Sequence, residues 1–284
     1  MSKLALLSMD VEDWYHLEYF GRNGFTEPSM LDGLERFQQL LAAEGQIPGT
    51  FFVVGEVARA HPALIRQLQA GGHEIASHGP DHRLASEIST PDFVSQLRAD
   101  KEDTEGIVGV SIRGYRAPCF ALGDEKLRRL PELGFQYDSS WIRFTRHPLY
   151  IPMDLSQWAE PCRGVRRAPD ADFFEFEIPT ARWWGGQVPF AGGAYFRVFP
   201  RVLVGRLVRR YLAQADVFVF YVHPFECSAQ RLTAYPPETA WANKLRFQLG
   251  RASMLARISW LVRLLRGRGF EFVTFTAARG ILLA

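Results

Sequence analysis

Two histidines, His78 and His82, lie four residues apart in the segment EIASHGPDHR, residues 74–83. Neutral imidazole binds Zn²⁺ and similar divalent ions well, and an i, i+4 spacing on one helical turn lets both rings face one ion. Two loop histidines bonded to the backbone are the alternative. The segment favours a metal site, because Gly71 and Gly72 end a predicted helix and His78 then emerges at the end of a short strand.

Three carboxylates, Asp10, Glu12 and Asp13, directly follow the first apolar run of the chain in the segment SMDVEDW. A site of two histidines and one carboxylate leaves coordination positions open for water and substrate, as a catalytic metal requires. A second carboxylate beside it can act as a general base. Helix capping or exposure to solvent is the alternative for these acids, and the segment alone is compatible with both.

Three further ionisable residues follow predicted strands elsewhere in the chain. His223 follows five apolar residues in FVFYVHPFE, where it is either a core residue or a general acid with a pKa near neutrality. Arg116 in RGYRAPCF can hold a buried carboxylate ionised or form a surface ion pair. Asp138 follows GFQY. Functional side chains of parallel barrels collect at the C-terminal ends of strands, so we expect these residues, Asp10 and His78 to meet.

The elements that position these residues alternate between strands and helices. We expect strands at residues 4–10, 49–55, 73–78, 112–118, 170–180, 215–226 and 270–276, and helices at 29–45, 61–72, 90–109, 123–135 and 253–269. Thr90 is the expected N-cap of the third helix. The alternation predicts parallel βαβ units in an α/β fold, and the number of units favours a barrel over a small open sheet.

Composition predicts a single globular domain over residues 1–284, with long loops at 142–200, where Pro, Gly, Trp and Phe interrupt the alternation. The net charge of +2 argues against nucleic-acid binding. Three widely spaced cysteines make no disulfide framework. The first apolar run is too short for a secretory signal, and no run reaches the ~18 residues of a membrane span. We therefore expect a cytoplasmic protein without a membrane span.

Five motifs in order resemble the NodB-homology polysaccharide deacetylases of carbohydrate esterase family 4. The strongest is TFFVVGEVARAHPALIRQLQAGGHEIASHGPDH, and the resemblance extends from Asp10 through His223 to the final strand. DVEDW and YVHPFE resemble the subgroup linked to bacterial exopolysaccharide gene sets, near the allantoinase-like and peptidoglycan deacetylase-like branch. The resemblance implies a distorted (β/α) barrel of about seven strands and a divalent metal ion, with Zn²⁺ as the expected ion.

The resemblance also implies a role for single residues. His78 and His82 match the two metal histidines of the family. The catalytic positions are matched by Asp10 as base, Arg116 as the arginine that holds the base, His223 as general acid and Asp138 as the acid that supports His223.

The sequence departs from the family pattern at several positions. Val11 follows Asp10 where many members have a second aspartate, so the third metal ligand is expected to be Glu12, with Asp13 as the alternative. Gly79 stands where many members have Ser or Thr. Cys119 stands where many have Tyr, but that position contributes mainly a backbone N–H to the oxyanion.

These residues together imply a metal-dependent hydrolase that removes an N-acetyl group from a sugar, in a bacterial polysaccharide or in its lipid- or nucleotide-linked precursor. One alternative is a hydrolase of a small non-sugar amide or ureide, as in the allantoinase-like branch. A second alternative is a non-catalytic relative that binds carbohydrate.

Overall fold

The computed structural model describes residues 2–21, 27–144, 146–183 and 186–284. Its strands are β1 (Lys3–Val11), β2 (Thr50–Val53), β3 (Glu74–Ser77), β4 (Gly114–Tyr115), β5 (Tyr137–Asp138), β6 (Ala159–Cys162), β7 (Val165–Arg167), β8 (Phe174–Phe176), β9 (Thr180–Trp183), β10 (Gly186–Pro189), β11 (Val217–Val222) and β12 (Phe270–Phe272). Its helices are α1 (Asp32–Ala43), α2 (Gly55–Ala60), α3 (Pro62–Ala70), α4 (Thr90–Val108), α5 (Asp124–Leu127), α6 (Gly193–Val198), α7 (Arg201–Leu212), α8 (Pro224–Cys227), α9 (Trp241–Gln248), α10 (Met254–Arg266) and α11 (Phe275–Leu283).

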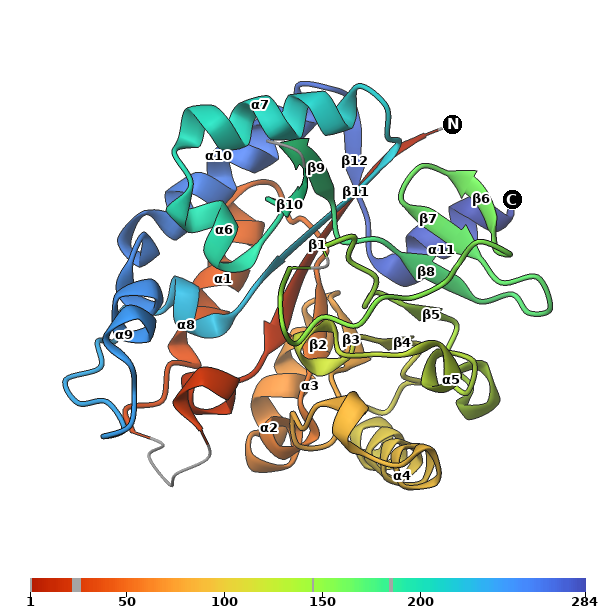
Figure 1. The fold of residues 1–284 in the computed structure, drawn as a ribbon, viewed down its shortest axis with the longest axis horizontal. Coiled ribbons are helices and arrows are strands. Elements are labelled where there is room, and N and C mark those ends of the chain that lie inside the picture. Colours follow the sequence, from red (N-terminus) through yellow and green to blue (C-terminus); the bar gives the residue numbers. More distant parts are fainter. Residues whose placement is uncertain (1, 22–26, 145, 184–185) are drawn as a thin grey trace.

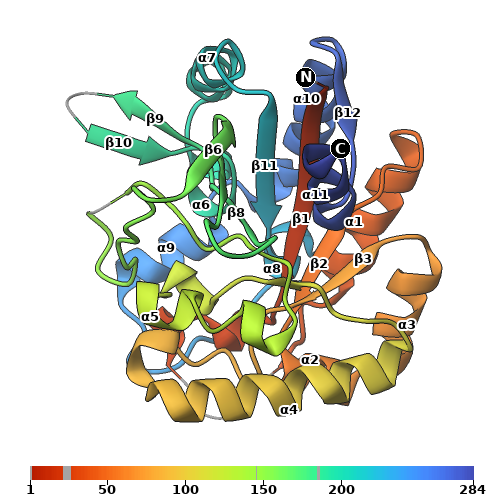
Figure 2. The same ribbon diagram turned by 90° about the vertical axis from the view of Figure 1, so that its right-hand side faces the viewer.

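A curled sheet forms the centre of the molecule, with the strand order β11-β1-β2-β3-β4-β5-β8-β7-β6 and β12 paired to β1 (Figure 1). The pairs from β11 to β8 are parallel, and β7 and β6 continue the sheet antiparallel. Helices α1, α3 and α4 cover the outside of the curve (Figure 2). This half-barrel of parallel strands confirms the predicted α/β barrel class.

Alternate residues of β1 face the two sides of the sheet, because successive side chains of a strand point in opposite directions. Ala5, Leu7 and Met9 pack in the large cluster that includes the outer helices. Leu4 and Leu6 pack on the inner side with Phe275 of α11. Both faces are therefore buried, which explains why this strand is apolar without alternation in the sequence.

Three local expectations were wrong. Ser89, not Thr90, caps α4, and its side chain accepts a hydrogen bond from the amide of Asp92. The helix expected at 123–135 is two short pieces, α5 and a 3₁₀ turn at Pro131–Leu133, since proline lacks the amide hydrogen that a continuous helix needs. β8 lies within the strand expected at 170–180, but the rest of the region 142–200 contains β6, β7, β9, β10 and α6 as well as loops, while residues 145 and 184–185 lie outside the described residues.

None of the described helices is long and apolar enough to cross a membrane.

Candidate active site

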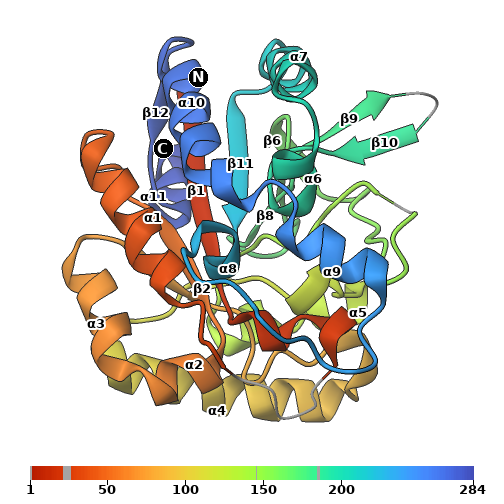
Figure 3. The same ribbon diagram turned by 90° about the vertical axis from the view of Figure 1, so that its left-hand side faces the viewer.

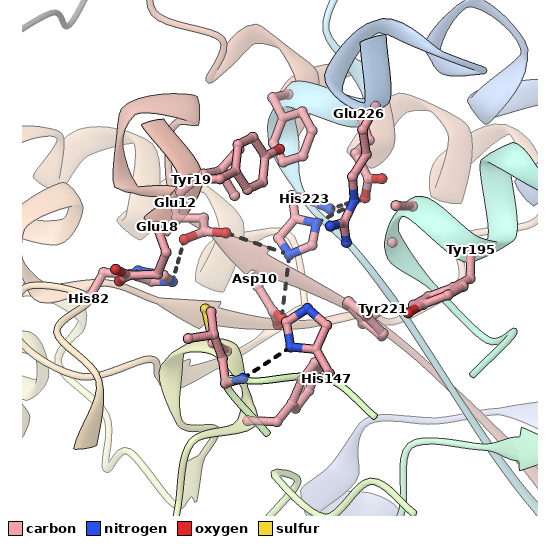
Figure 4. A pocket seen from close by; sticks show the side chains of 18 of the residues that line it. Asp10, Glu12, Glu18, Tyr19, His82, His147, Tyr195, Tyr221, His223 and Glu226 are labelled. Atoms are coloured by element: carbon pink, nitrogen blue, oxygen red, sulfur yellow. Dashed lines mark hydrogen bonds and ion pairs between the residues drawn. The ribbon is translucent and has the colours of Figure 1, made fainter. Parts of the chain in front are cut away.

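Five of the eight predicted site residues line one pocket at the C-terminal ends of the parallel strands. Asp10 lies near the end of β1, His78 directly after β3 and His223 directly after β11. These side chains line the pocket together with Glu12 and His82. Figure 4 shows Asp10, Glu12, His82 and His223 pointing toward one another. Residues up to 213 positions apart in the chain therefore meet, because parallel strands place their C-terminal ends at the same edge of the sheet.

Glu12, His78 and His82 form a cluster whose possible ligand atoms all lie within 4.8 Å of one another. All three side chains are buried. Glu12 Oε2 lies 2.5 Å from His82 Nε2, yet Oε2 has no hydrogen-bonding partner of good geometry among the described residues. Ligand atoms that converge without bonding one another suit a shared divalent cation, and one carboxylate with two imidazoles is a donor set that zinc accepts.

His78 has the protonation state that a metal ligand requires. Its Nδ1 lies 2.8 Å from the backbone carbonyl oxygen of Arg116, a contact that requires Nδ1 to carry the proton. Nε2 therefore has the free lone pair. Burial lowers the pKa of His78 to about 4, so the ring is neutral at pH 7.

The two histidines are presented by a loop rather than by the helical turn that their spacing suggested. Gly79 and His82 both have positive φ angles, +79° and +58°. The amide of Gly79 donates to Ser77 Oγ at 3.1 Å, and Ser77 Oγ in turn contacts the buried Asp100 of α4 at 3.4 Å. Gly79 adopts this left-handed conformation without the Cβ strain that a serine or threonine would bring.

Asp13 lies outside the cluster. Its side chain accepts hydrogen bonds from the amides of Trp14 and Met30 and from Ser29 Oγ. It caps the 3₁₀ turn at Trp14–His16. The two adjacent acids therefore differ in their contacts: Glu12 faces His82, and Asp13 satisfies backbone donors.

Asp10 is fixed by Arg116 in a buried network. Arg116 Nη1 donates to Asp10 Oδ1 at 2.6 Å and to Ser8 Oγ at 3.0 Å. Its Nε and Nη2 donate to the backbone oxygen and the hydroxyl of Ser139, both at 3.0 Å. The guanidinium also lies 4.0 Å from the centroid of the Phe52 ring. Four hydrogen bonds and a stacked ring leave this arginine little freedom, so it holds the Asp10 carboxylate in one orientation.

His223 is oriented by Glu226, a residue that sequence reasoning missed. His223 Nδ1 lies 2.9 Å from Glu226 Oε2, and Glu226 also pairs with the buried Arg197 at 2.6 Å. His223 Nε2 faces the pocket, 4.0 Å from Asp10 Oδ2 and 3.5 Å from Glu12 Oε1. Burial opposes protonation of His223, but the Glu226 hydrogen bond and the nearby carboxylates raise its pKa to about 9.

A local signal for Glu226 is present in the sequence. His223, Pro224 and Glu226 form a capping box at the start of α8, in which the Glu226 side chain accepts from the His223 amide and the His223 ring contacts the third helical position. A proline at the first position and an acid two residues later are typical of a helix start.

Asp138 does not support His223. Its carboxylate accepts hydrogen bonds from the amide and the hydroxyl of Ser140, at 2.9 Å each. Its second neighbour is the buried Glu175 of β8, which accepts from the amides of Ser140 and Trp141. Burial raises the pKa of Asp138 to about 6 and that of Glu175, beside the Asp138 charge, well above its usual range. The two acids therefore share one proton behind the pocket wall.

Cys119 and Phe120 line the pocket. Cys119 and Phe120 have φ angles of +51° and +56°, two successive non-glycine residues in the left-handed region. Such strained backbone gathers at functional sites. Burial raises the pKa of the Cys119 thiol well above its usual range, so the thiol is neutral and the backbone is the part that can serve a reaction.

Two family models match the chain. Residues 32–137 match the family described as polysaccharide deacetylase, and residues 145–278 match a domain of unknown function, DUF3473. A chitooligosaccharide deacetylase of Sinorhizobium fredii is 35% identical over 152 residues, which cover 53% of this chain and 61% of that protein. The peptidoglycan-N-acetylmuramic acid deacetylase PdaA of Bacillus subtilis is 28% identical over 115 residues, 40% of each chain. The matches thus span less than two thirds of these relatives' length.

Solved structures share the fold over nearly the whole chain. A Mycobacterium smegmatis protein described as a polysaccharide deacetylase superposes with a TM-score of 0.62 at 19% identity, covering 99% of this chain and 91% of that one. A CE4 family pseudoenzyme from Bacillus anthracis superposes with a TM-score of 0.56 at 11% identity, covering 98% and 66%. Residues 32–137, which include the loop with His78 and His82, thus match the polysaccharide deacetylase family, and nearly the whole chain shares the fold of these solved structures.

Proposed function

We propose that this protein is a metal-dependent hydrolase that removes an N-acetyl group from an N-acetylated sugar, and that residues 1–284 act as one domain. The observation that carries the proposal is the meeting of Asp10, Glu12, His78, His82 and His223 in one pocket. The sheet that positions them takes β1 to β5 from one part of the chain and β11 from the part matched by the second family model.

Glu12, His78 and His82 would hold the divalent ion, with Zn²⁺ as the ion that this donor set suits best. When bound, such an ion polarises the substrate carbonyl and acidifies water. Asp13 is not proposed as a ligand, since its oxygens are occupied by backbone and hydroxyl donors.

The remaining roles follow from the contacts of each side chain. Asp10, held by Arg116, accepts the proton of the attacking water. His223, held by Glu226, donates a proton to the leaving amine from the Nε2 that faces the pocket. The backbone N–H of Cys119 stabilises the oxyanion of the acetamide carbon. Asp138 and Glu175 shape the wall behind Arg116 without touching His223.

The substrate proposed is an N-acetylhexosamine in a bacterial exopolysaccharide or its lipid- or nucleotide-linked precursor. The deacetylase relatives named above, on chitooligosaccharide and on peptidoglycan, support this chemical class. Aromatic side chains beside the pocket, Tyr19, Tyr150 and Tyr195, offer faces on which a sugar ring can pack. A cytoplasmic location, which we also propose, favours the precursor.

Metal content of the purified protein tests the metal site first. We expect about one ion per chain in the wild type, and none in His78→Ala or His82→Ala. His147→Ala is the matched control, because His147 lines the same pocket but lies outside the cluster. A wild type that stays metal-free after incubation with zinc would overturn the proposal.

Deacetylation of N-acetylated oligosaccharides tests the catalytic roles. Asp10→Asn and His223→Ala should each lower kcat by about 10²- to 10⁴-fold, the usual contribution of a general base or acid. Near-normal kcat in either variant would remove that residue from its proposed role.

A further inference from the structure

Basic residues are concentrated in one part of the chain. Residues 193–268 contain 13 arginines and lysines but only three acids, Asp216, Glu226 and Glu238. The whole chain has 33 basic and 31 acidic residues, so the residues outside 193–268 include 20 basic and 28 acidic ones. Besides β11 and α8, this part forms α6, α7, α9 and α10, which lie on one side of the molecule, with α6, α9 and α10 toward the viewer in Figure 3. The small net charge of the chain therefore hides an excess of basic residues in this part, although Arg197 and Arg251 are buried and Arg263 and Arg266 pair with Glu44 at the end of α1.

The same side carries most of the large exposed apolar side chains. On α9, Trp241, Leu245 and the following Leu249 recur every four residues and are 76%, 50% and 47% exposed. Val198 at the end of α6 and Val202 at the start of α7 are 39% and 67% exposed. We name these five residues the α9 surface. Residues four apart share one helix face, so α9 presents an apolar stripe to solvent.

Cations flank the α9 surface. Arg246 and Lys244 lie on α9 itself, and Arg201 and Arg206 lie on α7 beside Val202. None of these four makes an ion pair with another described residue. An exposed tryptophan and leucines with unpaired cations at their edge are the features of a helix that lies in the interface of an anionic bilayer. A nucleic acid or an acidic polysaccharide would use the cations but would leave the leucines in water.

The α9 surface adjoins the active-site pocket. Arg197 of α6 donates to the backbone carbonyls of Arg246 and Leu249, which joins α6 to the end of α9. Arg197, Arg246 and Tyr195 line the pocket. A bilayer on the α9 surface would therefore lie beside the mouth of the pocket.

We propose that the α9 surface docks on an anionic lipid bilayer and so brings the pocket to substrate at the membrane plane. The proposed docking depends only on the α9 surface, whereas the presentation of substrate also depends on the proposed deacetylase activity. An experiment can therefore exclude one of these proposals without excluding the other.

Co-sedimentation of the full chain with lipid vesicles tests the docking. We expect binding to phosphatidylcholine vesicles that contain phosphatidylglycerol, little binding to phosphatidylcholine alone, and weakening with added salt. Trp241→Ser with Leu245→Ser should weaken binding by about tenfold or more, since both lose apolar insertion. Val110→Ser with Ile281→Ser is the matched control, because these residues are 43% and 42% exposed outside the α9 surface.

Quenching of tryptophan fluorescence by brominated lipids provides a second readout. Quenching in the wild type that is lost in Trp241→Phe would place this side chain in the bilayer. Equal binding of the paired Trp241 and Leu245 variant and the wild type, or binding to a soluble acidic polysaccharide without binding to vesicles, would overturn the proposal. Deacetylation of a soluble oligosaccharide, measured in parallel, should be unchanged in the paired variant, since neither residue lines the pocket.

Discussion

At the scale of single residues, the site depends on which carboxylate meets which base. Arg116 holds Asp10, Glu12 faces His82, and Glu226 holds His223. Each of these acids is at most 2% exposed, so each depends on the partners that contact it inside the protein. Exchanging one of these acids for its amide should therefore lower the catalytic rate while the fold is retained.

Glu226→Gln is predicted to lower kcat by about tenfold or more while KM changes little, because His223 loses the partner that orients its ring. Steady-state kinetics with a soluble N-acetylated oligosaccharide measure kcat and KM separately. Arg197→Met is the comparison, since it removes the other partner of Glu226 and leaves the His223 contact. If both variants lose the same kcat and the same Tm, Glu226 acts through stability rather than through His223.

At the scale of elements, two contacts behind the strands set the shape of the site. Asp100 of α4 contacts Ser77, whose hydroxyl accepts from the Gly79 amide in the histidine loop. Glu175 of β8 meets Asp138 of β5 beside the strand end that provides Ser139 to Arg116. A helix and an outer strand thus support loops that they do not themselves form.

Ser89→Ala is predicted to lower the free energy of unfolding by about 1 kcal/mol, the usual value of an N-cap side chain. Thr90→Ala is the matched control and should change it by less than about 0.5 kcal/mol, since the Thr90 side chain has no capping role. Urea denaturation at neutral pH measures both. Equal losses would mean that Ser89 does not cap α4.

The Asp138 and Glu175 pair predicts a pH dependence of stability. Burial raises the folded pKa of Glu175 well above its value of 4.5 in an open chain. Above pH 4.5 the unfolded chain loses this proton and the folded protein keeps it, so stability falls as pH rises, by up to about 1.4 kcal/mol per pH unit. Glu175→Gln should flatten the curve of unfolding free energy above pH 4.5. Parallel curves for wild type and variant would contradict a shared proton.

At the scale of the whole molecule, the site lies at one end of a core that does not depend on it. The large cluster of buried apolar residues runs from β1 through the outer helices, and Glu12, His78 and His82 lie beyond the strand ends. Removing a metal should therefore leave the fold intact.

Zinc is predicted to raise the Tm of the metal-free protein, since a ligand that binds only the folded state stabilises it. Chelation should return the Tm to its lower value with unchanged circular dichroism. The zinc-dependent rise should disappear in His82→Ala and persist in His147→Ala. A rise of equal size in His82→Ala would place the stabilising ion elsewhere.

The sequence by itself determined the strands that matter and the residues that end them. Apolar runs followed by Asp10, His78 and His223 were sufficient to predict that these residues lie together. Parallel strands place their C-terminal ends at one edge of the sheet, independent of the segments that connect them. The class of fold followed from the same alternation. Caps and loops were less predictable, since Ser89 and Thr90 are both favourable capping types and the backbone conformation decides between them.

Only the tertiary structure decided which acid acts on which partner. Asp138 was expected beside His223, but β5 lies five places from β11 in the sheet order, and Glu226 reaches the ring from the adjacent turn. Glu12 and Asp13 are alike in type and adjacent, yet one faces the histidines and the other the backbone. Such choices depend on side-chain direction and on distances of a few ångströms, which residue spacing along the chain does not fix.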